Sequence, residues 1–170
     1  ITAAHTDPAV RRQSQKERLI LSDHATTDTR EIIVEILLSL EKGQDFSHKL
    51  MKAVLDKYDY LDPREKAFIK RVTEGTIERQ LELDYYLDRF SSVPVRKMKP
   101  LIRCLLRMST YQILYMDAVP DSAVCNEACK LAAKRGFRTL KGFVNAVLRN
   151  ISRSKEQMPL PDPKDTVKYL

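Results

Sequence analysis

Positive charge collects along one side of a helix that the sequence predicts close to its end. The residues of this basic band are Arg138, Lys141, Asn145, Arg149 and Arg153. At about 100° per residue they lie within roughly 120° of one another around the helix axis. Guanidinium and ammonium groups pair with phosphate oxygens, and a carboxamide can bind a phosphate, a sugar or a base edge. The band therefore predicts a surface that binds an anion, and RNA is the anion that we expect.

The opposite side of the same segment predicts a surface for a protein core. Its apolar residues are Leu140, Phe143, Val144, Val147, Leu148 and Ile151. Gly142 lies inside the basic band, although a glycine within a helix costs about 1 kcal/mol relative to alanine. We therefore expect another backbone to come close at Gly142, where the missing side chain also removes bulk.

An amphipathic helix usually turns its charges to water, so solvation alone is the alternative to RNA binding. The long run of a single sign argues against that alternative. Residues 128–155 contain eight basic residues and no acidic one, and residues 89–116 contain six basic residues and no acidic one. Affinity for a nucleic-acid backbone grows with the number of phosphates neutralised, so segregated charge is what RNA binding needs. Arg135, just before the band, is a further candidate for a phosphate contact.

The composition indicates one domain of ordinary size with a tail or linker. The 170 residues carry a net charge of +7 and are 43% hydrophobic, which favours polyanionic partners, nucleic acid before acidic membrane. No apolar stretch reaches the roughly 18 residues of a membrane span, and no secretory signal is visible. We expect a cytoplasmic protein without a membrane partner. Because the chain starts at Ile1 rather than Met, we also expect a fragment or a processed product.

The three cysteines predict buried structural thiols. Cys104, Cys125 and Cys129 each lie in an apolar helical context. A single C-x3-C pair without a second pair does not make a zinc site, and this cysteine usage suits a reducing cytoplasm. Metal binding or redox chemistry by these cysteines is the alternative.

No set of residues in the sequence predicts catalysis or a nucleotide cofactor. The four glycines are widely separated, whereas a phosphate-binding loop needs clustered glycines before a helix. Two of the three histidines lie in the N-terminal tail, and the carboxylates have spacings typical of solvated helix faces. We expect no catalytic residue, metal or cofactor in this chain, which by itself is then not an enzyme.

Apolar residues at helical spacing predict an all-α fold of about seven helices with short connections. The predicted helices span residues 28–43, 46–58, 62–90 with a break near Glu82, 95–116 with a start or kink at Pro100, 121–135 and the segment of the basic band. Gly43 and Gly136 are expected to cap helix ends. Phe137 is expected to fold back on its cap, with stacking on a base as the alternative.

Further signals concern helix ends, helix packing and domain bounds. Asp62, Pro63 and Glu65 predict a capped helix start, and Gly75 predicts a close contact between two helices. Residues 1–27 form a polar, basic tail, in which a short helix over residues 10–21 is possible. We expect this tail to be solvated, with contact to RNA as the alternative. Residues 28–154 form the helical domain, and residues 155–170 form a proline-rich linker toward a further domain.

The segment from Val119 to Arg153 resembles the NusB-like RNA-binding family. The matching elements are the Val-Pro turn, Val124-Cys125-Asn126-Glu127-Ala128, Lys134-Arg135-Gly136-Phe137 and the run from Lys141 to Arg149. Weaker matches follow the expected order at Thr29-Arg30-Glu31, Asp62-Pro63-Arg64-Glu65 and residues 75–79. More narrowly, the chain is similar to the N-terminal domain of the RsmB (Sun/Fmu) ribosomal RNA 5-methylcytosine methyltransferases.

This resemblance implies two packed three-helix groups plus a further helix, in a domain that binds RNA. In the methyltransferases such a domain helps to place a separate catalytic domain, for which S-adenosylmethionine is the implied cofactor. Arg30 matches a family-like Arg-Glu position and joins the candidate RNA-binding residues. The chain shows no glycine-rich S-adenosylmethionine loop and no Pro-Cys nucleophile. The resemblance therefore implies an rRNA-targeting domain without the catalytic part.

Another class of function stays open. Free-standing NusB-type factors act in transcription antitermination, partly through a ribosomal protein. A helical face can serve a protein partner as well as RNA, so a protein-interaction module is the alternative.

Overall fold

A computed structural model of the chain describes residues 29–157. Within this range the chain forms seven α-helices, three short 3-10 turns and no strand, so the predicted all-α fold is confirmed. The helices are α2 (Thr29–Glu41), α3 (His48–Lys57), α4 (Pro63–Glu78), α5 (Gln80–Phe90), α6 (Pro100–Tyr115), α7 (Asp121–Lys134) and α8 (Lys141–Ser154). The 3-10 turns are η1 (Val95–Lys97), η2 (Arg138–Leu140) and η3 (Lys155–Gln157). The predictions for the N-terminal tail, and for the linker beyond residue 157, lie outside the described residues.

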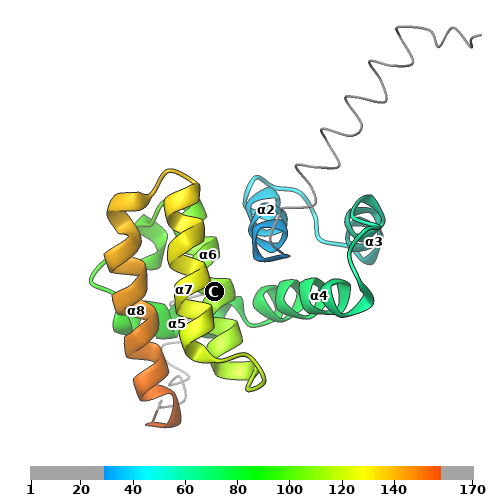
Figure 1. The fold of residues 1–170 in the computed structure, drawn as a ribbon. Helices are drawn as coiled ribbons and strands as arrows, with labels where there is room; N and C mark the ends of the chain where they lie inside the picture. The colour runs from blue at the N-terminus through cyan, green and yellow to red at the C-terminus, as the bar shows by residue number, and fades with distance from the viewer. Residues whose placement is uncertain (1–28, 158–170) are drawn as a thin grey trace, which may run out of the picture.

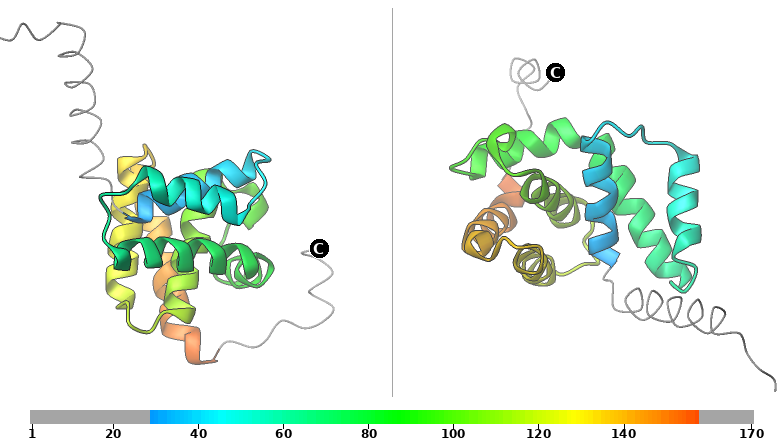
Figure 2. Two further views of the ribbon diagram at one scale, coloured as in Figure 1. Left: turned by 90° about the vertical axis from the view of Figure 1, so that its right-hand side faces the viewer. Right: turned by 90° about the horizontal axis from the view of Figure 1, so that it is seen from above.

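Helix α6 is the centre of the bundle. It packs against α2 and α4 on one side and against α5, α7 and α8 on the other (Figure 1). Seen from above, α2 separates α6 from α3, which is the outermost helix (Figure 2). Twelve of the sixteen residues of α6 are buried, whereas α3 buries only Met51. The arrangement has two groups of three helices in addition to the central helix α6, which matches the predicted organisation.

Several helix ends follow from local sequence. Asp62 and Glu65 form a reciprocal capping box at the start of α4, where Pro63 is the first helical residue. Gly43 and Gly136 have φ angles of +93° and +90°, a region that favours glycine because it has no Cβ. The predicted caps are therefore confirmed.

Helix α7 ends in a Schellman-type turn that positions the next segment. The amide of Phe137 donates to the carbonyl of Ala132 at 2.8 Å, and the amide of Gly136 donates to Ala133 at 3.3 Å. The Phe137 ring is partly buried against the core. Its predicted folding back is confirmed, and the turn leads the chain directly into η2 and α8.

Two predicted helix boundaries are refined by the structure. The break between α4 and α5 lies at Arg79, whose φ and ψ are −104° and 18°, rather than near Glu82. This earlier break turns α5 so that Leu83 and Leu87 face the core. The long helix begins at Pro100, and only the 3-10 turn η1 precedes it, since proline fits the first turn of a helix but not its interior.

The two internal glycines have different surroundings. A Cβ at Gly75 would collide with the ring of Tyr111, so the predicted close contact between helices is confirmed. A Cβ at Gly142 would meet no described atom within 4 Å. The expectation that a protein backbone approaches Gly142 is therefore wrong. Because α8 begins at Lys141, this glycine lies in the first turn of the helix rather than in its interior, and it faces open space.

All three cysteines are buried free thiols, as predicted. Burial raises the pKa of Cys104 to about 12, and it also raises the pKa of Cys125 and of Cys129. A thiol with a raised pKa is a poor nucleophile at neutral pH because little thiolate is present. The cysteines therefore act as core residues.

Candidate nucleic-acid interface

Helix α8 separates apolar and basic residues as the sequence predicts. Val144, Val147, Leu148 and Ile151 are buried, and Leu140 and Phe143 are partly buried against the same core. Lys141, Arg149 and Arg153 are exposed, and Asn145 is partly exposed. The basic band thus lies on the outer surface of the bundle.

The band is not carried by one helix, which corrects the sequence prediction. Arg138 belongs to the 3-10 turn η2, and α8 starts only at Lys141. Arg135 is the C-cap residue of α7. The Gly136 turn ends α7 in this interval, so helical geometry cannot run unbroken from Arg135 to Arg153.

Ion pairs divide the eight basic residues of 128–155 into two equal sets. Four of them pair with carboxylates: Lys130 with Glu127 at 3.3 Å, Lys134 with Glu31 at 2.6 Å, Arg135 with Glu31 and Glu35, and Lys155 with Asp121 at 3.0 Å. Within residues 29–157 the other four have no carboxylate partner: Arg138, Lys141, Arg149 and Arg153. These four are the cations of the predicted band. Their charge is free to act on an external anion.

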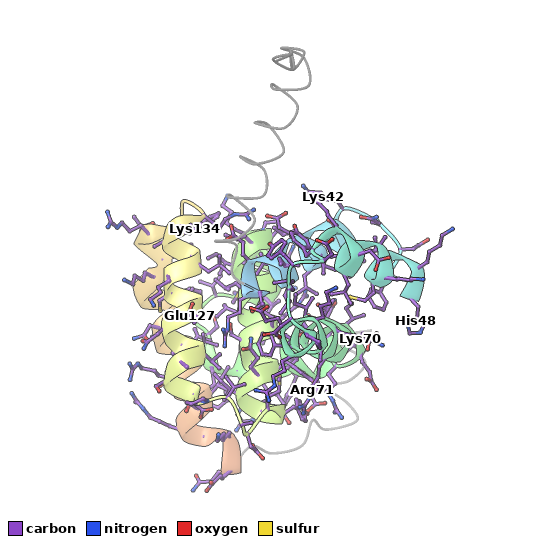
Figure 3. The ribbon with its side chains drawn as sticks, turned by 45° about the vertical axis from the view of Figure 1, so that its right-hand side comes forward. Lys42, His48, Lys70, Arg71, Glu127 and Lys134 are labelled. Carbon is purple, nitrogen blue, oxygen red and sulfur yellow. The ribbon has the colours of Figure 1, made fainter. Side chains whose placement is uncertain are left out.

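Arg135 lies between two helices rather than on the band. Its side chain is 29% exposed and pairs with Glu31 and Glu35 of α2. Lys134 at the same end of α7 pairs with Glu31, and it projects near the top of that helix in Figure 3. This end of α7 is thereby joined to α2, and an anion must compete with two carboxylates for Arg135.

Arg30 lies on α2, where its side chain contacts residues of α4 and α6. Its guanidinium stacks over the ring of Phe68 at 5.2 Å, and its Nε donates to Gln112 at 3.3 Å. Helix α7 stands between α2 and α8 (Figure 1). The structure therefore does not bring Arg30 together with the basic band.

A groove between α7 and α8 contains part of the band. Its volume is about 440 Å³, and its lining residues are Asn126, Cys129, Lys130, Lys141, Gly142, Asn145 and Arg149. Gly142 leaves the groove open because no side chain fills it. Arg149 Nε donates to Asn145 Oδ1 at 3.0 Å, which holds both side chains along the groove.

The groove has positive potential. No carboxylate lines it, and the first turn of α8, where the helix dipole is positive, contains no acidic residue. These charges also act on the pKa of the neighbouring Cys129 thiol. Burial raises the pKa of Cys129, while the charges of Lys141 and Arg149 act in the opposite direction. The site can therefore stabilise a negatively charged ligand.

Two lining residues, Asn126 and Lys130, are absent from the sequence-based candidates. They lie four residues apart on α7 and so share one face of it. That spacing is visible in the sequence, but only the packing of α7 against α8 shows which face borders the band.

A larger hollow of about 630 Å³ lies between α5 and the start of α6. Its most buried charges pair with each other or with α2: Arg107 with Asp84, and Arg103 with Glu41. These charges already have partners within the protein, so the groove between α7 and α8 is the better candidate for an anion.

Residues 29–157 contain neither a membrane-spanning helix nor a cluster of metal ligands. No helix there has the length and apolar character needed to cross a membrane. No group of three or more His, Cys, Asp or Glu side chains is arranged to hold a metal ion.

Comparison with known sequences places the domain among relatives of two kinds. The chain is 38% identical over 127 residues to the probable ribosomal RNA small subunit methyltransferase B of Bacillus subtilis (strain 168), and 29% identical over 128 residues to that of Synechocystis sp.. Each match covers 75% of this chain but 28% of the methyltransferase. The chain thus corresponds to little more than a quarter of the length of these relatives.

The second kind of relative is similar over most of its length. The transcription antitermination protein NusB of Kineococcus radiotolerans is 33% identical over 104 residues, which cover 61% of this chain and 76% of that protein. The solved structure of T. maritima NusB superimposes with a TM-score of 0.63 at 21% identity, over 84% of this chain and 98% of that one. The NusB family model matches residues 27–153. The chain therefore belongs to the NusB family.

Proposed function

We propose that this domain binds RNA through the basic band and the groove between α7 and α8. The observation that carries the proposal is the sorting of charge. Four of the eight cations in residues 128–155 are paired with carboxylates. The four that have no carboxylate partner in residues 29–157 are all exposed, and Lys141 and Arg149 among them line the groove. Unpaired cations bind phosphates without first breaking an internal ion pair.

The spacing along α8 suits a chain of phosphates. Lys141, Asn145, Arg149 and Arg153 follow one another at intervals of four residues, which corresponds to about 6 Å of helix rise per interval. Each cation that neutralises a phosphate releases a counterion, which favours association most strongly at low salt. Asn145 is held by Arg149 and keeps its amide protons for the ligand.

The finer proposal is a targeting domain of a bacterial ribosomal RNA cytosine-5 methyltransferase. It is supported by the 38% identity to the Bacillus subtilis methyltransferase and by the similar match to the Synechocystis protein. In this proposal the parent protein works on ribosomal RNA in the cytoplasm and uses S-adenosylmethionine in a separate catalytic domain. The present domain contributes RNA affinity and places the substrate.

The test is a binding series across salt concentrations with a fragment of small-subunit ribosomal RNA. For a single strand the logarithm of the association constant should fall with the logarithm of salt with a slope of about −0.7 per phosphate contact. Three or four contacts therefore predict a slope between about −2 and −3. Binding that does not depend on salt would contradict the proposal.

A transcription antitermination factor is the second candidate, favoured by the match to most of the Kineococcus radiotolerans NusB sequence. In that case the domain acts together with a protein, and a ribosomal protein is the expected partner. Two results together would favour the antitermination factor over the methyltransferase domain. The chain would recover a ribosomal protein from a nuclease-treated lysate, and the purified chain alone would not bind rRNA.

A further inference from the structure

Asn126 borders the groove from α7, outside the basic band. It is exposed and lines the same groove as Asn145 of α8. Within the part of the chain that the structure describes, its carboxamide has no hydrogen-bond partner. Both its carbonyl oxygen and its amide group are therefore available to a ligand.

Asn145 offers a different set of groups. Its Oδ1 already accepts a hydrogen bond from Arg149 Nε at 3.0 Å, so toward the groove it acts mainly as a donor. The two carboxamides are thus not equivalent. Asn126 presents a donor beside an acceptor, as a base edge requires. Asn145 presents donors near the cation of Arg149.

The groove has the size and the opening for one nucleotide. Its volume of about 440 Å³ lies within the range of about 300–1,000 Å³ that is usual for small-molecule sites. Gly142 leaves space at its surface, while Lys141 and Arg149 supply unpaired positive charge around it. The base edges of an RNA duplex are difficult to reach, whereas those of unpaired nucleotides are open to side chains.

We infer that the groove between α7 and α8 holds one unpaired nucleotide and that Asn126 reads its base edge. This inference rests on the proposed RNA binding and adds sequence selectivity to it. A free carboxamide matches the N6 donor and N7 acceptor of adenine, so adenine is the expected base. Asn145 and the neighbouring cations hold the sugar and phosphates on either side.

The experiment measures binding of the full 170-residue chain to labelled single-stranded oligo(A), oligo(C) and oligo(U) of equal length. The unaltered chain should bind oligo(A) most tightly. Asn126→Ala should remove that preference, with a loss of roughly 5- to 150-fold on oligo(A) and little change on the others. The salt slope should not change, because no phosphate contact is removed.

Asn150→Ala is the matched control. Asn150 is an exposed asparagine on α8 that does not line the groove, so its replacement should leave the preference intact. Asn126→Asp keeps the shape and the acceptor but loses the donor, and it should also lose the preference. Circular dichroism spectra of all variants verify that they are folded.

The outcomes separate this inference from the proposed function. Salt-dependent binding with equal affinity for the three oligonucleotides, or a preference for oligo(A) that survives in Asn126→Ala, overturns base reading and leaves RNA binding standing. If none of these oligonucleotides and no rRNA fragment binds, both proposals fall.

Discussion

The arginines of α6 and those of α8 have opposite surroundings, although both sets lie in runs without acidic residues. Arg103 and Arg107 of α6 have side chains that are 18% and 10% exposed, and carboxylates from α2 and α5 neutralise them. Arg149 and Arg153 of α8 are exposed and have no carboxylate partner in residues 29–157. Charge along the sequence therefore does not distinguish a structural cation from a binding one. The two kinds of cation are distinguished by whether folding brings a carboxylate close to them.

The α6 cluster is a compact network of charge-assisted hydrogen bonds. Arg107 donates from Nε and Nη2 to Asp84, at 2.7 Å each, and from Nη1 to Glu41 at 3.0 Å. Arg103 donates two further bonds of 2.7 Å to Glu41. The cluster joins α2 and α5 to the central helix. The cluster stabilises the fold because it pairs charges that folding has already removed from water.

Removing one member of this cluster should give the largest effect. Arg107→Ala leaves Asp84, a buried residue, without its main partner, and we expect the free energy of unfolding to fall by about 3–5 kcal/mol. Urea denaturation followed by circular dichroism measures the loss. A change below about 1 kcal/mol would mean that the α6 cluster behaves like a surface ion pair, and the contrast with α8 would disappear.

Changing the free cations should affect binding and leave stability nearly unaltered. In the triple variant Arg138→Ala, Lys141→Ala and Arg149→Ala, we expect the salt slope to become shallower by about 2, since about 0.7 is lost for each phosphate contact. The unfolding free energy should shift by less than about 0.5 kcal/mol per substitution. Fluorescence anisotropy at several salt concentrations measures the slope.

Arg135→Ala is the control for this triple variant. Because Arg135 pairs with Glu31 and Glu35, its loss should weaken RNA binding less than Arg149→Ala does. The reverse order would show that the inter-helix ion pair opens for RNA.

Acid should weaken the α6 cluster before it affects the α8 surface. Burial raises the pKa of Glu41, but hydrogen bonds and charge from Arg103, together with the charge of Arg107, outweigh it and lower the pKa overall. A carboxylate with a lowered pKa adds stability above its ordinary pKa of about 4.3. That stability is lost as the pH falls through the lower, folded-state value. Unfolding midpoints at neutral and acidic pH should therefore differ more in the unaltered chain than in Glu41→Gln.

Gly142→Ala should have the smallest effect on stability and the opposite sign. The new methyl group meets no described atom within 4 Å, and alanine favours helix, so stability should rise by less than about 1 kcal/mol. RNA affinity should decrease if the groove is occupied, because the methyl group enters it. A more stable variant with unchanged RNA affinity would place the ligand elsewhere on the band.

Much of the fold follows from local patterns in the chain. The capping box at Asp62, the left-handed turns at Gly43 and Gly136, and the apolar side of α8 depend on residues within a few positions of each other. Such interactions are set mainly by neighbouring residues in the chain, so the elements could be predicted. The one-helix interpretation of the basic band was wrong because the residues that follow the Gly136 cap form the 3-10 turn η2, which contains Arg138, and α8 begins only at Lys141.

The candidate site is a mixture of predicted and unpredicted parts. The type and spacing of Lys141, Asn145, Arg149 and Arg153 were enough to expect an exposed basic surface, since their apolar neighbours must face the core. The sequence could not show that Glu31 and Glu35 neutralise Arg135, or that Asn126 and Lys130 border the same groove. Those contacts join residues from different helices. Helix periodicity fixes a direction around each axis but not which axes meet, and only the packing of α2, α7 and α8 determines which charges remain free.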